Sequence, residues 1–152
     1  MSHPEEKLAE LGLKLPDVAK PVAAYVPAVR TGDLVYTSGQ LPLREGTLIA
    51  TGKVGGEVSA DVASECAQQC ALNALAAVKA EIGDLAGVKR IVKAVAFIAS
   101  TPDFTGQPQV ANGASELFGQ VFGDAGQHAR SAVGVPVLPL DAPVEVEILV
   151  EV

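Results

Sequence analysis

One arginine of the chain, Arg130, follows a glycine-rich turn and precedes an apolar stretch with the composition of a buried strand. A guanidinium stays charged in a protein, and its planar fork of donors matches a carboxylate with two parallel hydrogen bonds. An arginine at the start of a buried strand in an acidic protein therefore indicates an anion-binding site. A structural ion pair with one of the chain's own acids is the alternative interpretation, which only other residues can exclude.

The remaining residues with nucleophilic or metal-binding chemistry are few. Cys66 and Cys70 are four positions apart, which puts both on one face of a helix, and consecutive helical turns do not offer disulfide geometry. The two histidines, His3 and His128, lie near opposite ends of the chain. We therefore expect the cysteines to be small buried apolar residues, and we expect no metal site. His128 precedes Arg130 by two residues, and we expect it to be a structural residue at the rim of the site.

The composition predicts one domain spanning residues 1–152, with residues 1–20 forming an N-terminal helix and loop extension. The chain has 152 residues, of which 49% are apolar, so it can bury a core without disulfides. Its net charge of −7 and the absence of any basic run argue against binding to a phosphate backbone. The polar, acidic N-terminus is not a secretory signal, and no apolar run approaches membrane length. We expect a soluble cytoplasmic protein without membrane contact.

Hydrophobic periodicity and turn residues divide the chain into helices and strands. The pattern predicts helices over about 2–12, 59–82 and 107–122, and strands over 22–30, 33–38, 41–43, 47–50, 88–99, 132–138 and 144–152. The last strand alternates apolar and acidic residues almost without exception.

This order of elements predicts an α+β domain with a mostly antiparallel sheet. The two longer helices each carry one apolar stripe, so both can cover the same face of the sheet. The opposite face would then expose small and apolar residues to water. Association of several chains through that face is the expected remedy.

Four stretches of the sequence together resemble the Rid family, also called YjgF or endoribonuclease L-PSP. They are Tyr25-Val-Pro-Ala-Val, Gly32-Asp-Leu-Val-Tyr-Thr-Ser-Gly-Gln-Leu-Pro42, Ala129-Arg-Ser-Ala-Val-Gly-Val135 and Leu138-Pro-Leu-Asp-Ala-Pro-Val-Glu-Val-Glu-Ile148. The resemblance covers about residues 22–152. The N-terminal helix and the Asn112-Gly-Ala-Ser stretch resemble a longer subgroup of that family.

The resemblance implies a chorismate-mutase-like fold, with ferredoxin-like β-α-β order, a six-stranded mostly antiparallel sheet and two helices on one face. It also implies a homotrimer whose sheets form a central barrel, with a pocket at each subunit interface. The implied activity is hydrolysis of reactive enamines and imines, such as 2-aminoacrylate and 2-iminopropionate, to 2-keto acids and ammonia. No cofactor is implied, because the substrate supplies its own electrophile.

The resemblance assigns two catalytic residues, Arg130 and Glu145. Arg130 would bind the carboxylate of a small imino or keto acid, and Glu145 would orient a water or relay a proton. The substrate-binding positions that match the family are Tyr25, Ser38, Gly39, Asn112 and Ala132.

Each of these positions has a simpler interpretation. Glu145 could belong to a solvated strand face, and Tyr25 could be a core residue. Ser38 and Gly39 could form a strand-end turn, and Asn112 could lie on a helix surface without a role. Ala132 departs from many family members, which carry a cysteine there, so a thiol mechanism is excluded at this position while the backbone groups remain.

Two other functions compete with imine hydrolysis. A non-catalytic binder or sensor of small carboxylates would use the same pocket with a misplaced water. An endoribonuclease or translation inhibitor would need a basic groove with stacking aromatic residues. The acidic, aromatic-poor composition disfavours the nucleic-acid partner.

Overall fold

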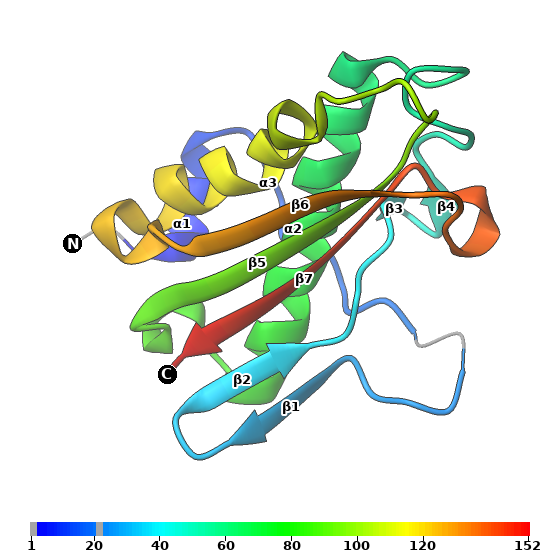
Figure 1. The fold of residues 1–152 in the computed structure, drawn as a ribbon. Helices are drawn as coiled ribbons and strands as arrows, with labels where there is room; N and C mark the ends of the chain where they lie inside the picture. Colours follow the sequence, from blue (N-terminus) through cyan, green and yellow to red (C-terminus); the bar gives the residue numbers. More distant parts are fainter. Residues whose placement is uncertain (1–2, 21–22) are drawn as a thin grey trace.

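The computed structural model describes residues 3–20 and 23–152 as a layer of helices packed on one face of a twisted sheet (Figure 1). The helices are α1 (Pro4–Glu10), α2 (Ala60–Ile82) and α3 (Gln107–Phe122), with short 3-10 turns η1 (Leu85–Gly87), η2 (Gly123–Gly126) and η3 (Pro139–Asp141). The strands are β1 (Ala28–Thr31), β2 (Leu34–Thr37), β3 (Leu43–Arg44), β4 (Thr47–Leu48), β5 (Arg90–Ala99), β6 (Ala129–Val135) and β7 (Val144–Glu151).

Five strands form the main sheet in the order β1-β2-β7-β5-β6. Neighbouring strands are antiparallel except β5 and β6, which run parallel because the crossover through α3 connects them. Strand β6 therefore ends the sheet on one side, and the hairpin β1–β2 ends it on the other (Figure 1).

Helices α2 and α3 both cover the same face of this sheet, as the apolar stripes predict (Figure 1). Helix α2 begins at the cap residue Ser59, whose Oγ accepts a hydrogen bond from the Val62 backbone N–H, and ends at Gly83, whose φ is 88°. Its sheet-facing side is built from small residues, which let the helix axis approach the strands closely. The side chains of Val144, Val146 and Val150 on β7 are fully buried beneath it.

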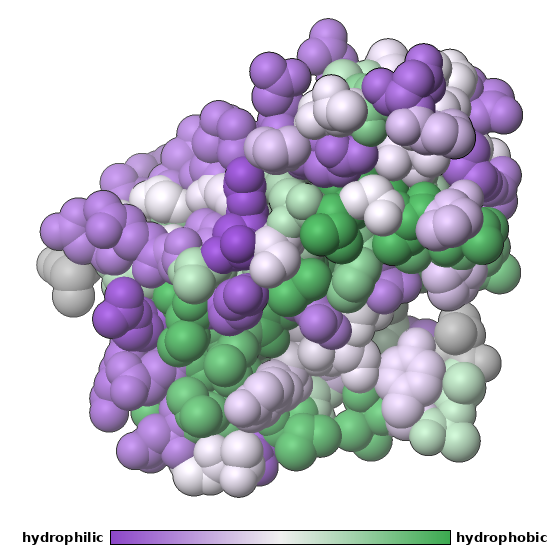
Figure 2. Space-filling view, viewed as in Figure 1, coloured by the Kyte–Doolittle hydropathy of each residue, from purple (hydrophilic) through white to green (hydrophobic). Residues whose placement is uncertain are grey.

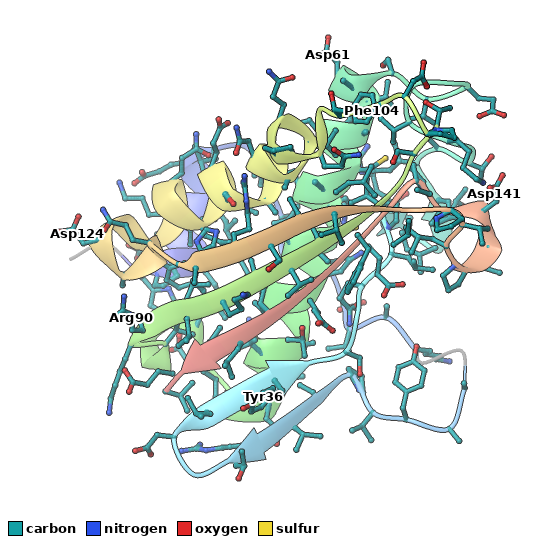
Figure 3. The ribbon with its side chains drawn as sticks, in the orientation of Figure 1. Tyr36, Asp61, Arg90, Phe104, Asp124 and Asp141 are labelled. Atoms are coloured by element: carbon teal, nitrogen blue, oxygen red, sulfur yellow. The ribbon has the colours of Figure 1, made fainter. Side chains whose placement is uncertain are left out.

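The opposite face of the sheet carries no helix among the described residues. An apolar band crosses this face in Figure 2. Val29 and Tyr36 are paired across β1 and β2, and their exposed fractions are 53% and 48%. Figure 3 shows Tyr36 on β2 at this face, and Val133 on β6 adds another exposed apolar side chain. This much apolar surface in one place is typical of an interaction surface.

The α+β, chorismate-mutase-like fold is confirmed, but the expected six-stranded sheet is wrong. The main sheet has five strands, because β3 and β4 pair only with each other around the turn Glu45-Gly46, where both φ angles are positive. Strand β1 begins at Ala28 rather than at residue 22, which lies outside the described residues. Strand β6 begins at Ala129 rather than Ala132, because its pairing with β5 starts at Lys93.

The N-terminal extension forms the expected short helix, α1, which begins after His3; residues 1–2 lie outside the described part. Leu8 of α1 is buried in the common core. Within the described residues, no helix has the length and the apolar content that crossing a bilayer requires.

A close approach between α2 and α3 at Gly113 generates the first prediction. A Cβ at Gly113 would lie 2.0 Å from the Ser64 backbone oxygen, so Gly113→Ala must push the two helices apart. We expect a loss of about 1–3 kcal/mol in the free energy of unfolding, measured by thermal or denaturant unfolding. Gly119→Ala on the same helix is the matched control, because no heavy atom lies within 4 Å of its Cβ position. A stability of Gly113→Ala equal to that of the control would contradict the packing described.

Candidate active site

The guanidinium of Arg130 is held on one side by helix α3. Its Nη1 donates to Asn112 Oδ1 at 2.8 Å and to Ser115 Oγ at 3.2 Å. Arg130 pairs in register with Ala94 of β5, a buried residue of the helix-facing side of the sheet, so the side chain projects towards α3. Across residues 3–20 and 23–152, its Nε and Nη2 groups have no hydrogen-bond partner, and no carboxylate forms an ion pair with Arg130. The described residues therefore contradict the alternative interpretation, in which Arg130 forms a structural ion pair.

Ser115 connects Arg130 to His128. The Ser115 Oγ lies 2.8 Å from His128 Nε2, and His128 Nδ1 lies 2.6 Å from the Gly126 carbonyl oxygen. A carbonyl only accepts, so Nδ1 carries a hydrogen, and Nε2 of a neutral imidazole accepts from the Ser115 hydroxyl. We call Asn112, Ser115, His128 and Arg130 the arginine cluster.

A shallow groove of about 350 Å³ opens beside the arginine cluster. It is lined by Ser115, Gly119, Gly126, Gln127, His128 and Arg130. Helix α3, turn η2, the two residues that follow η2 and the start of β6 supply these residues. Figure 3 marks this end of the molecule with Asp124 of η2. The groove has room for a small molecule next to Arg130.

A second group of predicted residues gathers around Glu145, at the start of β7. A Cβ placed on Gly39 would lie 2.3 Å from Glu145 Oε2, so any larger residue at this position would have to displace the carboxylate. Ser38 donates from Oγ to the Val26 carbonyl at 2.6 Å, which ties the segment carrying Tyr25 to the end of β2. We call Ser38, Gly39 and Glu145 the glutamate cluster.

The carboxyl group of Glu145 is half-buried. Burial is the main cause that raises its pKa above the ordinary value of 4.5, and the nearby carboxylate of Glu147 raises it further. A carboxyl with a raised pKa holds its proton more readily, which suits a group that exchanges a proton with substrate or water.

The two clusters lie far apart within one chain. Glu145 pairs with Phe97 of β5, whereas Arg130 pairs with Ala94, so the two are separated by about 10 Å along the sheet and by about 10 Å across it. Glu145 also alternates with the buried Val144 and Val146, which places its side chain on the face opposite the helices. In Figure 3, Asp124, which precedes β6, and Asp141, which precedes β7, lie at opposite ends of the sheet. One small molecule cannot contact both groups of the same chain.

The structure thus divides the predicted residues between two places. Arg130, Asn112 and Ala132 lie on the helix side of β6 and α3, and Asn112 bonds the guanidinium itself. Tyr25 is 46% exposed, which excludes its alternative interpretation as a core residue. Ser115 was missed as a site residue, although its spacing of three from Asn112 puts both on one helix face.

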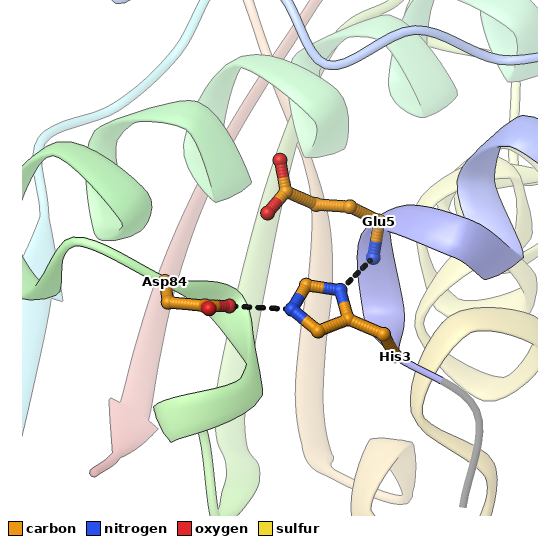
Figure 4. Close-up of side chains that lie close together, drawn as sticks. All are labelled: His3, Glu5 and Asp84. Carbon is orange, nitrogen blue, oxygen red and sulfur yellow. Dashed lines mark hydrogen bonds and ion pairs between the residues drawn. The ribbon is translucent and has the colours of Figure 1, made fainter.

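A further cluster of possible metal ligands lies away from these residues, at the N-terminus (Figure 4). Ligand atoms of His3, Glu5 and Asp84 all lie within 4.8 Å of one another. However, His3 Nδ1 accepts from the Glu5 backbone N–H, so Nε2 of a neutral ring carries the hydrogen and donates to Asp84 at 2.7 Å. The Glu5 carboxylate is bonded to Lys79 Nζ. The hydrogen bonds of this cluster connect α1 to η1. They already use the atoms of His3 and Glu5 that would bind a metal ion, so the cluster does not suit one.

The cysteines are buried small residues, as predicted. Cys66 and Cys70 are both fully buried and unpaired. Burial is the largest cause that raises the pKa of Cys66 to about 11, with a smaller contribution from Glu65, and burial raises the pKa of Cys70 well above its ordinary value. A thiol held in its protonated form is a poor nucleophile.

The raised pKa of Glu145 predicts a pH-dependent effect on stability. The folded state binds the proton of this carboxyl more tightly than the unfolded state does, so ionisation destabilises the fold as pH rises above 4.5. Glu145→Gln should therefore raise Tm at neutral pH by a few degrees at most, on the order expected for a partly screened carboxyl. The difference should vanish in melting curves recorded below pH 4.5. A substitution that lowers Tm at neutral pH would contradict this account.

Comparison with known proteins agrees with the fold and with the motifs. The family model described as "YjgF/chorismate_mutase-like, putative endoribonuclease" matches residues 5–152. Protein TCP17 of Trypanosoma cruzi is 45% identical over 145 residues, covering 95% of this chain and 91% of that protein. The RutC family protein slr0709 of Synechocystis is 31% identical over 127 residues, covering 84% of this chain and 85% of that protein.

Solved structures show the same architecture. The protein Atu1372 of Agrobacterium tumefaciens, described as having unknown function, superposes with a TM-score of 0.93 at 45% identity, covering 98% of this chain and 92% of that chain. The YjgF gene product of E. coli superposes with a TM-score of 0.63 at 32% identity, covering 89% of this chain and 93% of that chain. The match over residues 5–152, together with these relatives, shows that the chain belongs to the YjgF/chorismate mutase-like family.

Proposed function

We propose that the protein hydrolyses reactive 2-imino acids and their enamine tautomers to 2-keto acids and ammonia. The observation that carries this proposal is the guanidinium of Arg130, which is held through Nη1 while its Nε–Nη2 edge has no partner among the described residues. That edge presents two parallel donors, which is the arrangement that binds a carboxylate, and Arg130 lines a groove with room for a small molecule.

The proposed site is shared between neighbouring copies of the chain. The arginine cluster and the glutamate cluster occupy opposite faces of the sheet, so a second copy has to supply the missing half. The exposed apolar side chains of the open sheet face favour such an association. We propose a closed homotrimer in which each arginine cluster meets the glutamate cluster of a neighbour.

The reaction adds one water to the imine carbon. Arg130 holds the substrate carboxylate, which fixes the adjacent electrophilic carbon, and positioning of this kind removes several kcal/mol from a barrier. Water adds its oxygen to the carbon and a proton reaches the nitrogen, giving a carbinolamine. This intermediate then loses ammonia to leave the 2-keto acid. In this proposal the half-buried carboxyl of Glu145 takes the proton of the water and returns it to the departing nitrogen.

The cytoplasm is the proposed location of this activity. The two buried cysteines are unpaired, which fits a reducing compartment.

A binder of small carboxylates is the second candidate, because the unbonded edge of Arg130 would serve it equally well. An RNA-cleaving function is disfavoured, since the net charge is −7 and an RNA groove needs clustered positive charge. Thermal stabilisation by pyruvate without any acceleration of imine hydrolysis would select the binder. Salt-dependent affinity for single-stranded RNA would select the RNA-cleaving function.

The test measures the lifetime of an imine generated by an amino-acid oxidase and captured by a trapping nucleophile. The wild-type protein should shorten that lifetime, and Arg130→Ala should lower kcat/KM by about 100-fold or more, because the paired charge-assisted bonds to the carboxylate are lost. Arg130→Lys should recover only part of this loss, since an ammonium lacks the planar fork.

Arg90→Ala is the matched control, because Arg90 is an exposed arginine on the neighbouring strand β5 (Figure 3). Its kcat/KM should stay at the wild-type level. Normal turnover by a folded Arg130→Ala protein would overturn the proposed function.

A further inference from the structure

Both hydrogens of one nitrogen of Arg130 are already used within the chain. The Nη1 group has two N–H bonds, and the Asn112 and Ser115 side chains accept from it at 2.8 and 3.2 Å. The guanidinium therefore cannot turn its end, the Nη1–Nη2 pair, towards a ligand without breaking one of these bonds. Only the side formed by Nε and Nη2 remains for a ligand.

The direction of the Ser115 hydroxyl is fixed in turn by His128. Because His128 Nδ1 bonds the Gly126 carbonyl, Nε2 is the acceptor of a neutral ring, and the serine hydrogen points to it over 2.8 Å. The lone pairs of Ser115 Oγ are then left to face Arg130. A chain of hydrogen bonds therefore runs from Arg130 through Ser115 and His128 to the backbone of η2.

Packing holds the far end of this chain. A Cβ on Gly126 would lie 2.1 Å from the Phe118 backbone oxygen, so only glycine lets η2 lie this close to α3. The His128 ring stands edge-on to Phe118, with ring centroids 5.5 Å apart. Phe118 itself is fully buried. The imidazole is thus anchored both by its Nδ1 bond and by an aromatic contact.

We propose that Asn112, Ser115 and His128 are positioning residues, which fix the guanidinium of Arg130 so that its Nε–Nη2 side stays free for the ligand. The inference rests on the proposed function and gives a role to two residues, Ser115 and His128, that the proposed reaction does not use.

The test separates positioning from a general loss of structure. Ser115→Ala should raise KM about tenfold while kcat changes by less than about threefold, because binding of the carboxylate and not the chemical step is weakened. Inhibition by 2-oxobutanoate should weaken by the same factor. Ser115→Thr, which keeps the hydroxyl, should restore most of the wild-type KM.

Two substitutions test the positioning role of His128 in the same way. His128→Phe keeps an aromatic ring against Phe118 but removes the acceptor, and KM should rise about three- to tenfold. His128→Gln offers an amide oxygen as a new acceptor for Ser115 and should lie closer to wild type. Gln120→Ala, an exposed substitution on the same helix, should leave both constants unchanged.

Each result bears on one claim. Wild-type KM in folded Ser115→Ala and His128→Phe proteins would overturn the positioning role while leaving the proposed function intact. Absence of turnover in the wild type would instead overturn the proposed function. Covalent labelling of Ser115 by a fluorophosphonate, with kcat lost in Ser115→Ala, would make the serine a nucleophile and would also overturn the positioning role.

Discussion

The two hydrogen bonds from Arg130 Nη1 to helix α3 are the interaction on which the rest of the site depends. They hold a permanent positive charge on the helix side of the edge strand β6, where no carboxylate of the described residues pairs with it. Strand alternation holds Glu145 on the other side of the same sheet. The period of two along a strand therefore separates these two charged groups, and under the proposed function it makes one chain half of a site.

The core of the domain is what brings α3 to Arg130. Small residues on α2 let it lie close to the sheet, and Gly113 lets α3 lie close to α2. The position of α3 in turn places Asn112 and Ser115 opposite the start of β6. Gly126 closes the turn between α3 and β6 so that His128 reaches Ser115. Burial of apolar surface and the fixing of one guanidinium are thus achieved by the same contacts.

The sequence predicted the parts of this molecule that follow local rules. The boundaries of α3 match those expected from its apolar stripe, and the alternation along β7 is the one seen. The start of β6 was placed three residues too late, because its first residues become a strand only through tertiary pairing with β5. The strands near residues 41–50 were counted into the main sheet, since a short alternating pattern cannot say which neighbour it pairs with.

The residue types of the candidate site were predictable from the sequence, but the contacts between those residues were not. Arg130 stands out by its charge at the start of an apolar strand, and motif resemblance adds Glu145, Ser38 and Gly39. The sequence could not show that Gly39 makes room for the Glu145 carboxylate, nor that Ser115 and His128 meet across the η2 turn, because both depend on contacts between distant segments. The distance between Arg130 and Glu145 along the sheet follows from strand register, which the sequence pattern does not specify in advance.

Reconstitution of mixed assemblies tests the central claim, a site shared between copies, most directly. Arg130→Ala and Glu145→Ala proteins, each inactive alone, are unfolded together in equal amounts, refolded and assayed for imine hydrolysis. Random cyclic trimers should recover about one quarter of the wild-type activity, because that fraction of interfaces joins an intact arginine cluster to an intact glutamate cluster. Mixtures that stay as inactive as the separate variants, although they form mixed assemblies, would contradict a shared site.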